Sequence, residues 1–287
     1  MKVGLILASE GQGPYLDSIN TQADSGGRQA QKKHGDNLTL TPLRLNKDGS
    51  NQKELLDRLA SDGNGLIFSP TSDSAVVKSA QEHPDVTYAF FGRDALCDQH
   101  KNLVCLHGRY QEGSFLVGAA AALKSKSHII GFIGETPSDG DTYTSQAGYQ
   151  AGVAYIDKQK GTNTKSLVDY TEQAEDSTPN GNELALKQIN QGADVIYHSG
   201  LGVAGFGIVQ ACTAKQKYAI GFEVDWSVLV DPLKGGYAFL GLPERAVDYA
   251  QNQYNKDLLA DTPQALDDIK QKIINGEIKV PDKPTTR

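Results

Sequence analysis

The sequence lacks the features that mark several classes of protein. Its 28 lysine and arginine residues form no block, and the formal net charge is -7. Because phosphate contacts need clustered basic side chains, the sequence predicts no nucleic-acid partner. No apolar run approaches the roughly 20 residues that a membrane-spanning helix needs, and the longest, Phe115–Leu123, has the length of a core helix. With 38% hydrophobic and 22% charged residues, the composition is that of a folded globular protein.

A leader peptide is missing too. Met1 runs directly into an expected strand, Lys2–Ala8. We interpret this start as the trimmed form of an exported protein, without its signal segment or a lipid-anchor cysteine. A cytosolic protein would begin in the same way.

Cysteine is scarce, and its arrangement leaves two interpretations open. Cys97 and Cys105 flank a turn-like segment, so a hairpin disulfide would suit an exported protein, while two free thiols fit as well. Cys212 is left over in an expected helix. The spacing of Cys97, His100, Cys105 and His107 is not that of a zinc site, so we expect no metal.

Signatures of catalysis are few. There is no Gly-x-Ser-x-Gly elbow, and the six histidines show no metal spacing. One dinucleotide fingerprint, Gly200–Gly205 (GLGVAG), follows an expected strand and opens a helix, with an acid, Glu223 or Asp225, at a suitable distance. However, no full βαβαβ pair follows the motif and no proton-transfer group accompanies it. We therefore expect no enzyme and no cofactor, and keep an NAD-dependent enzyme as an alternative.

Apolar runs alternate with helical periodicity along the chain, which predicts α/β structure with parallel sheets. The expected strands are Val3–Leu7, Thr39–Leu45, Gly65–Phe68, Thr87–Phe91, Leu103–Leu106, Ile129–Ile133, Lys165–Val168, Val195–His198, Tyr218–Phe222 and Tyr237–Leu240. The expected helices include Gln52–Ala60, Ala75–Glu82, Glu112–Ser125, Ser145–Ile156, Glu183–Gln191 and Pro243–Leu258. The alternation restarts near residue 129, as two similarly wound, Rossmann-like lobes joined by a hinge would require.

Seven segments carry a family resemblance: Gln111–Leu123 (QEGSFLVGAAAAL), His83–Ala89, Ile130–Gly134, Ala147–Val153, Gln191–Tyr197, Tyr218–Gly221 and Ile273–Pro281. Together they resemble the basic membrane protein family, the purine-nucleoside-receptor type of substrate-binding lipoprotein that serves ABC importers. The first segment is similar to the family's signature helix.

The resemblance implies a type-I periplasmic-binding-protein fold. Its N-terminal lobe would comprise residues 1–107 and about 237–262, and its C-terminal lobe residues 108–236 and 263–287. It also implies an extracytoplasmic receptor that closes on a nucleoside or similar flat heteroaromatic compound and passes it to an importer permease. A ligand sensor with the same fold and no transport role is a further alternative.

In the C-terminal lobe, the resemblance places the family's ligand residues on Tyr197, as an aromatic that stacks on a base, and on Glu223 and Asp225, as acids that hold ribose hydroxyls. The family's lysine falls on Lys234. The glycine turn at Gly200 would bring backbone close to the ligand. For Asp225 and Lys234 the alternative is a solvated charge.

The N-terminal lobe departs from the family. The early Asp is replaced by Ser9 and the stacking Phe by Ile19, and only Asn20 is plainly kept. Tyr15 is a candidate for the missing ring. Asp94 is the acid nearest to the family's strand-end Asp.

Three further rings are candidates for the cleft. Trp226, Phe68 and Tyr143 lie where strands end or helices begin, and each is a ligand contact or a packing residue. The departures in the N-terminal lobe make purine specificity the less firm part of the prediction.

Overall fold

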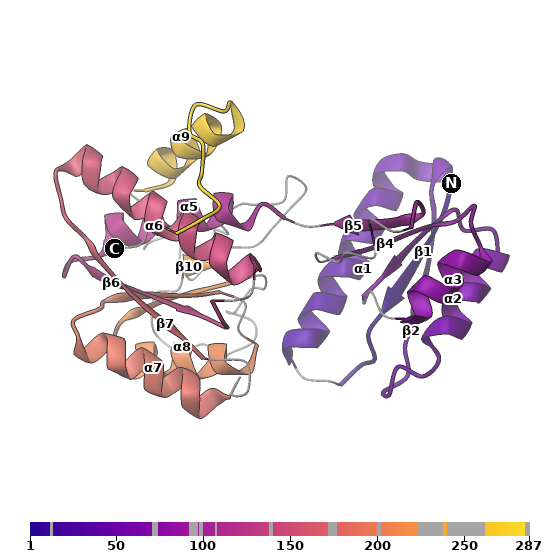
Figure 1. Ribbon diagram of the computed structural model, residues 1–287, viewed down its shortest axis with the longest axis horizontal. Coiled ribbons are helices and arrows are strands. Elements are labelled where there is room, and N and C mark those ends of the chain that lie inside the picture. Colours follow the sequence, from indigo (N-terminus) through magenta and orange to yellow (C-terminus); the bar gives the residue numbers. More distant parts are fainter. Residues whose placement is uncertain are drawn as a thin grey trace. The chain divides into compact units, whose positions relative to one another are not determined.

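The computed structural model describes residues 1–11, 14–70, 74–91, 97, 100–106, 108–137, 140–171, 177–199, 202–222, 238–239 and 262–284. The chain divides into two compact units, residues 1–107 and 108–287. Each unit contains a five-stranded parallel sheet with helices on both faces (Figure 1). The predicted α/β fold with two parallel sheets is confirmed.

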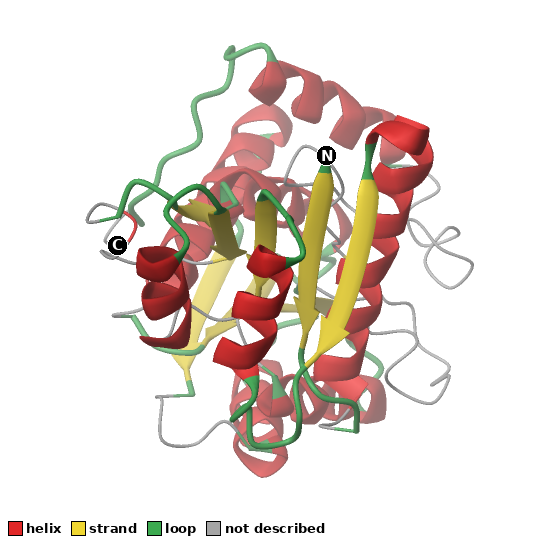
Figure 2. Cartoon of the chain, turned by 90° about the vertical axis from the view of Figure 1, so that its right-hand side faces the viewer, coloured by secondary structure: helices red, strands yellow, loops and turns green. Residues whose placement is uncertain are grey.

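The first unit contains β1 (Lys2–Leu7), α1 (Pro14–His34), the 3-10 turn η1 (Gly35–Asn37), β2 (Thr39–Arg44), α2 (Gln52–Ser61), β3 (Leu66–Ser69), α3 (Ser74–Glu82), β4 (Thr87–Phe91) and β5 (Leu103–Leu106). The strand order is β2-β1-β3-β4-β5. Figure 2 shows short helices lying across the face of the parallel strands of this unit.

Side-chain pattern explains why the helices of this unit lie where they do. In α2 the apolar residues Leu55, Leu56 and Leu59 fall on one stripe, and the last two are fully buried. A Cβ added at Gly4 in β1 would meet the Leu59 side chain, so α2 lies directly on the sheet. Burial of each leucine contributes about 1.5–3 kcal/mol to stability.

The second unit contains α5 (Tyr110–Lys124), β6 (Ile129–Gly134), α6 (Gly140–Lys160), β7 (Lys165–Tyr170), α7 (Thr178–Asn190), β8 (Val195–Ser199), α8 (Val203–Ala214), β9 (Tyr218–Gly221), β10 (Ala238–Phe239) and α9 (Pro263–Ile274). The strand order is β10-β9-β8-β6-β7. Helices α5, α6 and α9 lie on one face of the sheet, and α7 and α8 lie on the other (Figure 1).

Glycines allow α5 and α6 to approach at backbone distance. A Cβ added at Gly148 would lie 2.0 Å from the Gln111 carbonyl oxygen, and one at Gly118 would lie 2.0 Å from the Tyr149 carbonyl oxygen. Helices α7 and α8 meet in the same way, since a Cβ at Gly207 would lie 1.9 Å from the Thr178 carbonyl oxygen. The small residues of the Gln111–Leu123 segment therefore serve helix packing.

All ten predicted strands are present, and none of their ends is shifted by more than two residues. Two helices, α1 and α9, were not predicted; the sequence of α1 is polar and contains the pair Gly26-Gly27. The predicted helix 243–258 lies outside the described residues. None of the helices in the described part of the chain is long and apolar enough to span a bilayer.

The predicted division into lobes stays a prediction for residues 237–262, most of which lie outside the described part of the chain. Residues 237–262 were assigned to the N-terminal lobe, but Ala238 and Phe239 form β10, which pairs with β9 in the second sheet. Helix α9 packs through Leu266 and Ile269 into the core of the second unit. Apart from β10, residues 237–261 lie outside the described part of the chain.

Candidate ligand-binding site

Strand order identifies the ligand-binding edge of each sheet. In open parallel sheets, ligands bind beyond the carboxyl ends of the strands, where the direction of winding reverses. That reversal falls between β1 and β3 in the first unit and between β6 and β8 in the second. Functional side chains are therefore expected just after these four strands.

In the first unit, the turn after β1 is held by two side chains. Asn20 Oδ1 accepts a hydrogen bond from the Ala8 N–H at 2.9 Å, and Asn20 Nδ2 donates to the Ala8 carbonyl at 3.2 Å. Arg44, the last residue of β2, donates to the same carbonyl at 3.1 Å and forms an ion pair with Glu10 at 3.2 Å. Ser9 lies between these contacts and is 4% exposed.

The carboxyl end of β3 is polar and buried. Ser69 ends the strand, and its Oγ accepts a hydrogen bond of 3.2 Å from Gln52 Nε2 at the start of α2. Both side chains are buried. Phe68, the preceding residue, is partly buried. Of the other predicted residues of this unit, Tyr15 lies in α1 with its side chain outside the described part, and Asp94 lies outside it entirely.

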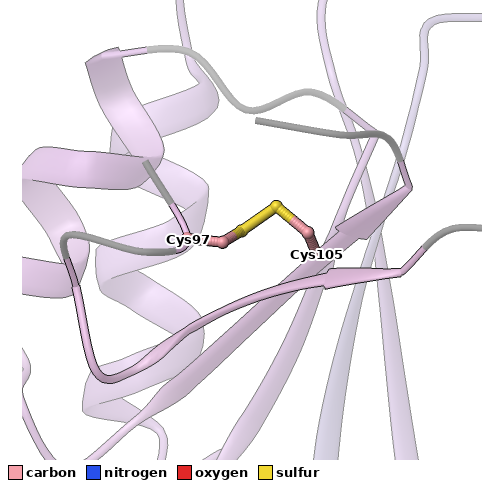
Figure 3. The surroundings of a disulfide bond; sticks show 2 residues. All are labelled: Cys97 and Cys105. Atoms are coloured by element: carbon pink, nitrogen blue, oxygen red, sulfur yellow. A yellow bond between two sulfur atoms is a disulfide. The ribbon is translucent and has the colours of Figure 1, made fainter. Parts of the chain in front are cut away.

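A disulfide joins Cys97 to Cys105, with their Cα atoms 5.9 Å apart (Figure 3). This settles the alternative between a hairpin disulfide and two free thiols. Cys105 lies in β5, and Cys97 lies on the connection from β4 to β5. The bond thus joins Cys97 to the strand β5.

In the second unit, the side chain of Tyr197 lies in the hydrophobic core. It is 1% exposed, its ring packs against Phe132 and Tyr149 with centroids 5.6 and 5.4 Å apart, and its hydroxyl lies 3.1 Å from Ser114 Oγ. The ring is therefore enclosed on the α5/α6 face of the sheet and offers no free face for a base. The prediction that Tyr197 stacks on the ligand is not supported by this position.

The end of β8 is polar but also buried. His198 and Ser199, at the carboxyl end of the strand, are 0% and 1% exposed. Burial lowers the pKa of His198 to about 3, so the imidazole is neutral at physiological pH. A neutral ring at this edge offers hydrogen-bonding atoms and no positive charge.

A cluster that the sequence did not reveal lies at the ends of β7 and α6. Tyr170, the last residue of β7, donates a hydrogen bond from its hydroxyl to Gln146 Oε1 in α6. Burial, followed by the electrostatic influence of Tyr143, raises the pKa of Tyr170. Tyr143, a predicted cleft ring, is 37% exposed. Tyr170 and Gln146 are 24 residues apart, so no local pattern pairs them.

The other predicted residues of this unit, namely Gly200, Glu223, Asp225, Trp226 and Lys234, lie outside the described residues. Of the dinucleotide fingerprint, Gly202 is the N-cap of α8 and Gly205 is buried within that helix. The expected turn from strand into helix is thus supported for these two glycines.

One group of possible metal ligands occurs in the described part of the chain. Asp57, Glu82 and His83 place ligand atoms within 4.8 Å of one another. The Lys53 ammonium bonds to Asp57 at 2.6 Å and to Glu82 at 2.7 Å, so a lysine already supplies a cation to both carboxylates. The group is an ion-pair network between α2 and α3. Cys97 and Cys105, being bonded to each other, offer no thiolate to a metal.

Two units, each with a helix-covered parallel sheet, define the type-I periplasmic-binding-protein fold. The ABC transporter system solute-binding protein from Conexibacter woesei has a similar structure, with a TM-score of 0.68 and 18% identity over 98% of this chain and 99% of that one. This likeness shows the fold.

Sequence relatives identify the family. A family described as "ABC transporter substrate-binding protein PnrA-like" matches residues 13–232. Basic membrane protein A of Borreliella burgdorferi is 27% identical over 98% of this chain and 87% of that protein. Basic membrane protein B of the same organism is 32% identical over 61% of this chain and 51% of that protein. The chain belongs to the PnrA-like family of ABC transporter substrate-binding proteins.

Membership of this family confirms the resemblance drawn from the sequence. The family consists of extracytoplasmic solute-binding proteins rather than enzymes. The Gly200–Gly205 motif is therefore part of a binding protein, and the alternative of an NAD-dependent enzyme is set aside.

Proposed function

We propose that this protein is the receptor of an ABC importer for a nucleoside or a similarly flat heteroaromatic compound, which it delivers to the importer's permease. The observation that carries the proposal is the PnrA-like family match, which spans residues 13–232 and so includes the carboxyl ends of β3, β6 and β8. The polar groups at those edges support it, because an uncharged ligand with several hydroxyls needs hydrogen-bonding partners more than charges.

The proposed contacts differ in role. In the first unit we assign Ser9, Tyr15, Phe68 and Asp94 to the ligand. Asn20 instead holds the turn that carries Ser9, because both its amide oxygen and its amide nitrogen are hydrogen-bonded to the backbone of Ala8.

In the second unit we assign Tyr143, the Gly200 turn, Asp225, Trp226 and Lys234 to the ligand. A carboxylate such as that of Asp225 accepts hydrogen bonds from two sugar hydroxyls, while an aromatic ring covers the flat face of a base. Tyr197 is left out, because its ring is enclosed in the core.

The Cys97–Cys105 disulfide supports the part of the proposal that concerns location. Disulfides persist in oxidising compartments and are rare in the reducing cytosol. We propose that the native protein is held at the outer face of the cytoplasmic membrane by an N-terminal lipid. Metabolic labelling of the native protein with a radioactive fatty acid tests this, and absence of label would contradict the anchor.

A thermal-unfolding screen with nucleosides, nucleobases, riboflavin and simple sugars tests the ligand class. A ligand at a hundred times its Kd stabilises the native state by about 2.7 kcal/mol. We expect a concentration-dependent rise in Tm with at least one nucleoside. The variant Asp225→Asn should lose most of it, whereas Asp36→Asn, the same change at an exposed turn, should keep it. A rise with sugars alone would contradict a flat heteroaromatic ligand.

A further inference from the structure

An aromatic pair lies at the carboxyl end of the second sheet, outside every residue assigned so far. Tyr110 is the first residue of α5, and Phe222 directly follows β9. Their ring centroids are 5.4 Å apart and the ring planes are inclined by 55°. Both side chains are partly buried, so each keeps some surface in contact with solvent.

Each ring is fixed by its surroundings. Phe222 packs against the core of the second unit. Tyr110 folds back over the backbone of Gly108, where a Cβ would lie 3.2 Å from its Cε1 atom. Rings held in this way contact a ligand at little cost in conformational entropy.

The pair also lies on the edge where a ligand is expected. β9 is the neighbour of β8, which borders the reversal of winding, and Phe222 comes immediately after the carboxyl end of β9. The other ring pairs of the described residues are Phe115–Tyr155, Phe132–Tyr149, Phe132–Tyr197 and Tyr149–Tyr197. All of these belong to the core of the second unit or pack against it.

We propose that Tyr110 and Phe222 form the aromatic surface with which the second unit contacts the planar ring of the ligand. The inference rests on the proposed function and supplies the aromatic contact that Tyr197, enclosed in the core, does not make. A planar ring stacked on one member of the pair meets the other at a tilt, an arrangement that the quadrupoles of aromatic rings favour.

The test is calorimetric titration of the full chain with inosine and with adenosine. Tyr110→Leu and Phe222→Leu remove a ring and keep apolar bulk, and each should raise Kd about twofold to tenfold. Tyr110→Phe and Phe222→Tyr keep the ring and should bind within about twofold of the wild type.

Tyr155→Leu is the matched control, because Tyr155 and Phe115 form a pair of similar geometry, with centroids 5.6 Å apart and planes at 59°. It should lower Tm and leave Kd unchanged. The inference is overturned if both leucine variants bind with wild-type affinity, or if Tyr155→Leu weakens binding as much as they do. If the wild type binds neither these nor any other nucleoside, the proposed function itself fails and the inference falls with it.

Discussion

Asn20 holds the backbone of Ala8 through both of its polar atoms, accepting from the N–H at 2.9 Å and donating to the carbonyl at 3.2 Å. The contact joins the second turn of α1 to the point where β1 ends, twelve residues earlier in the chain. It fixes the start of the turn that carries Ser9, on the ligand-binding edge of the first sheet. Asn20, predicted from the sequence as a ligand contact, therefore has a structural role in holding this turn.

Replacing Asn20 should cost stability. Asn20→Ala leaves the partly buried Ala8 N–H without its partner and the Ala8 carbonyl with Arg44 alone, and we expect the free energy of unfolding to fall by about 1–3 kcal/mol in urea titrations. Thr21→Ala is the control, since that hydroxyl bonds only to the Asp17 carbonyl on an exposed helix face, and it should change stability by less than about 0.5 kcal/mol. Equal effects of the two changes would contradict the role given to Asn20.

Removing the disulfide should also destabilise the first unit. The bond closes a loop with a sequence separation of 8, and a loop of this size contributes about 2–3 kcal/mol by restricting the unfolded chain. We expect the double variant Cys97→Ser, Cys105→Ser to unfold at lower temperature than the wild type. A reducing agent should lower the Tm of the wild type toward that of the variant and leave the Tm of the variant unchanged. A wild-type Tm that does not respond to full reduction would show that the bond is absent in solution.

The contact between α5 and α6 predicts intolerance of a single methyl group. Gly148→Ala would place a Cβ 2.0 Å from the Gln111 carbonyl oxygen, and separating the helices should cost about 1–3 kcal/mol. Gly26→Ala is the matched control within α1, where a Cβ meets nothing within 4 Å, and better helix propensity should raise stability by about 0.5–1 kcal/mol. Chemical denaturation of both variants measures the difference, and a tolerated Gly148→Ala would contradict the close packing.

Stability should fall in mild acid because of His198. Its pKa in the native state is about 3, whereas an unfolded histidine has a pKa of about 6.5. Between these values the unfolded state binds the extra proton, so the contribution of the neutral ring is complete above about pH 6.5 and is lost as the pH falls toward 3.

For this one histidine, the free energy of unfolding changes by at most about 1.4 kcal/mol per pH unit. Urea titrations between about pH 7 and pH 5 should show a smaller loss of stability for His198→Gln than for the wild type. The carboxyls with lowered pKa, those of Asp48, Asp57, Asp157 and Asp194, titrate at lower pH and do not obscure the comparison. Identical pH dependence in both proteins would contradict the assignment.

The strands could be predicted from the sequence because parallel strands are buried on both faces and appear as short apolar runs. The face of the sheet on which each side chain lies could not be predicted. Tyr197 and His198 are neighbours at the end of one strand, and a shift of one residue reverses the face on which a side chain lies. Contacts made in the fold, such as that of its hydroxyl with Ser114, 83 residues away on α5, show that Tyr197 points into the core.

The same limit applies to the residues that the sequence did not suggest. Tyr170 with Gln146, and Tyr110 with Phe222, are pairs brought together by strand order and helix placement. No local spacing in the sequence predicts these pairs. Near residue 237 the apolar run predicts a strand but does not identify the sheet to which that strand belongs, and only the pairing of β10 with β9 does so.

Calorimetric titration of the wild-type chain with a panel of nucleosides tests the central claim most directly. The account predicts saturable binding of one nucleoside per chain, with the negative change in heat capacity that burial of a flat apolar ring produces. Absence of heat with every nucleoside, together with saturable binding of a simple sugar, would contradict it.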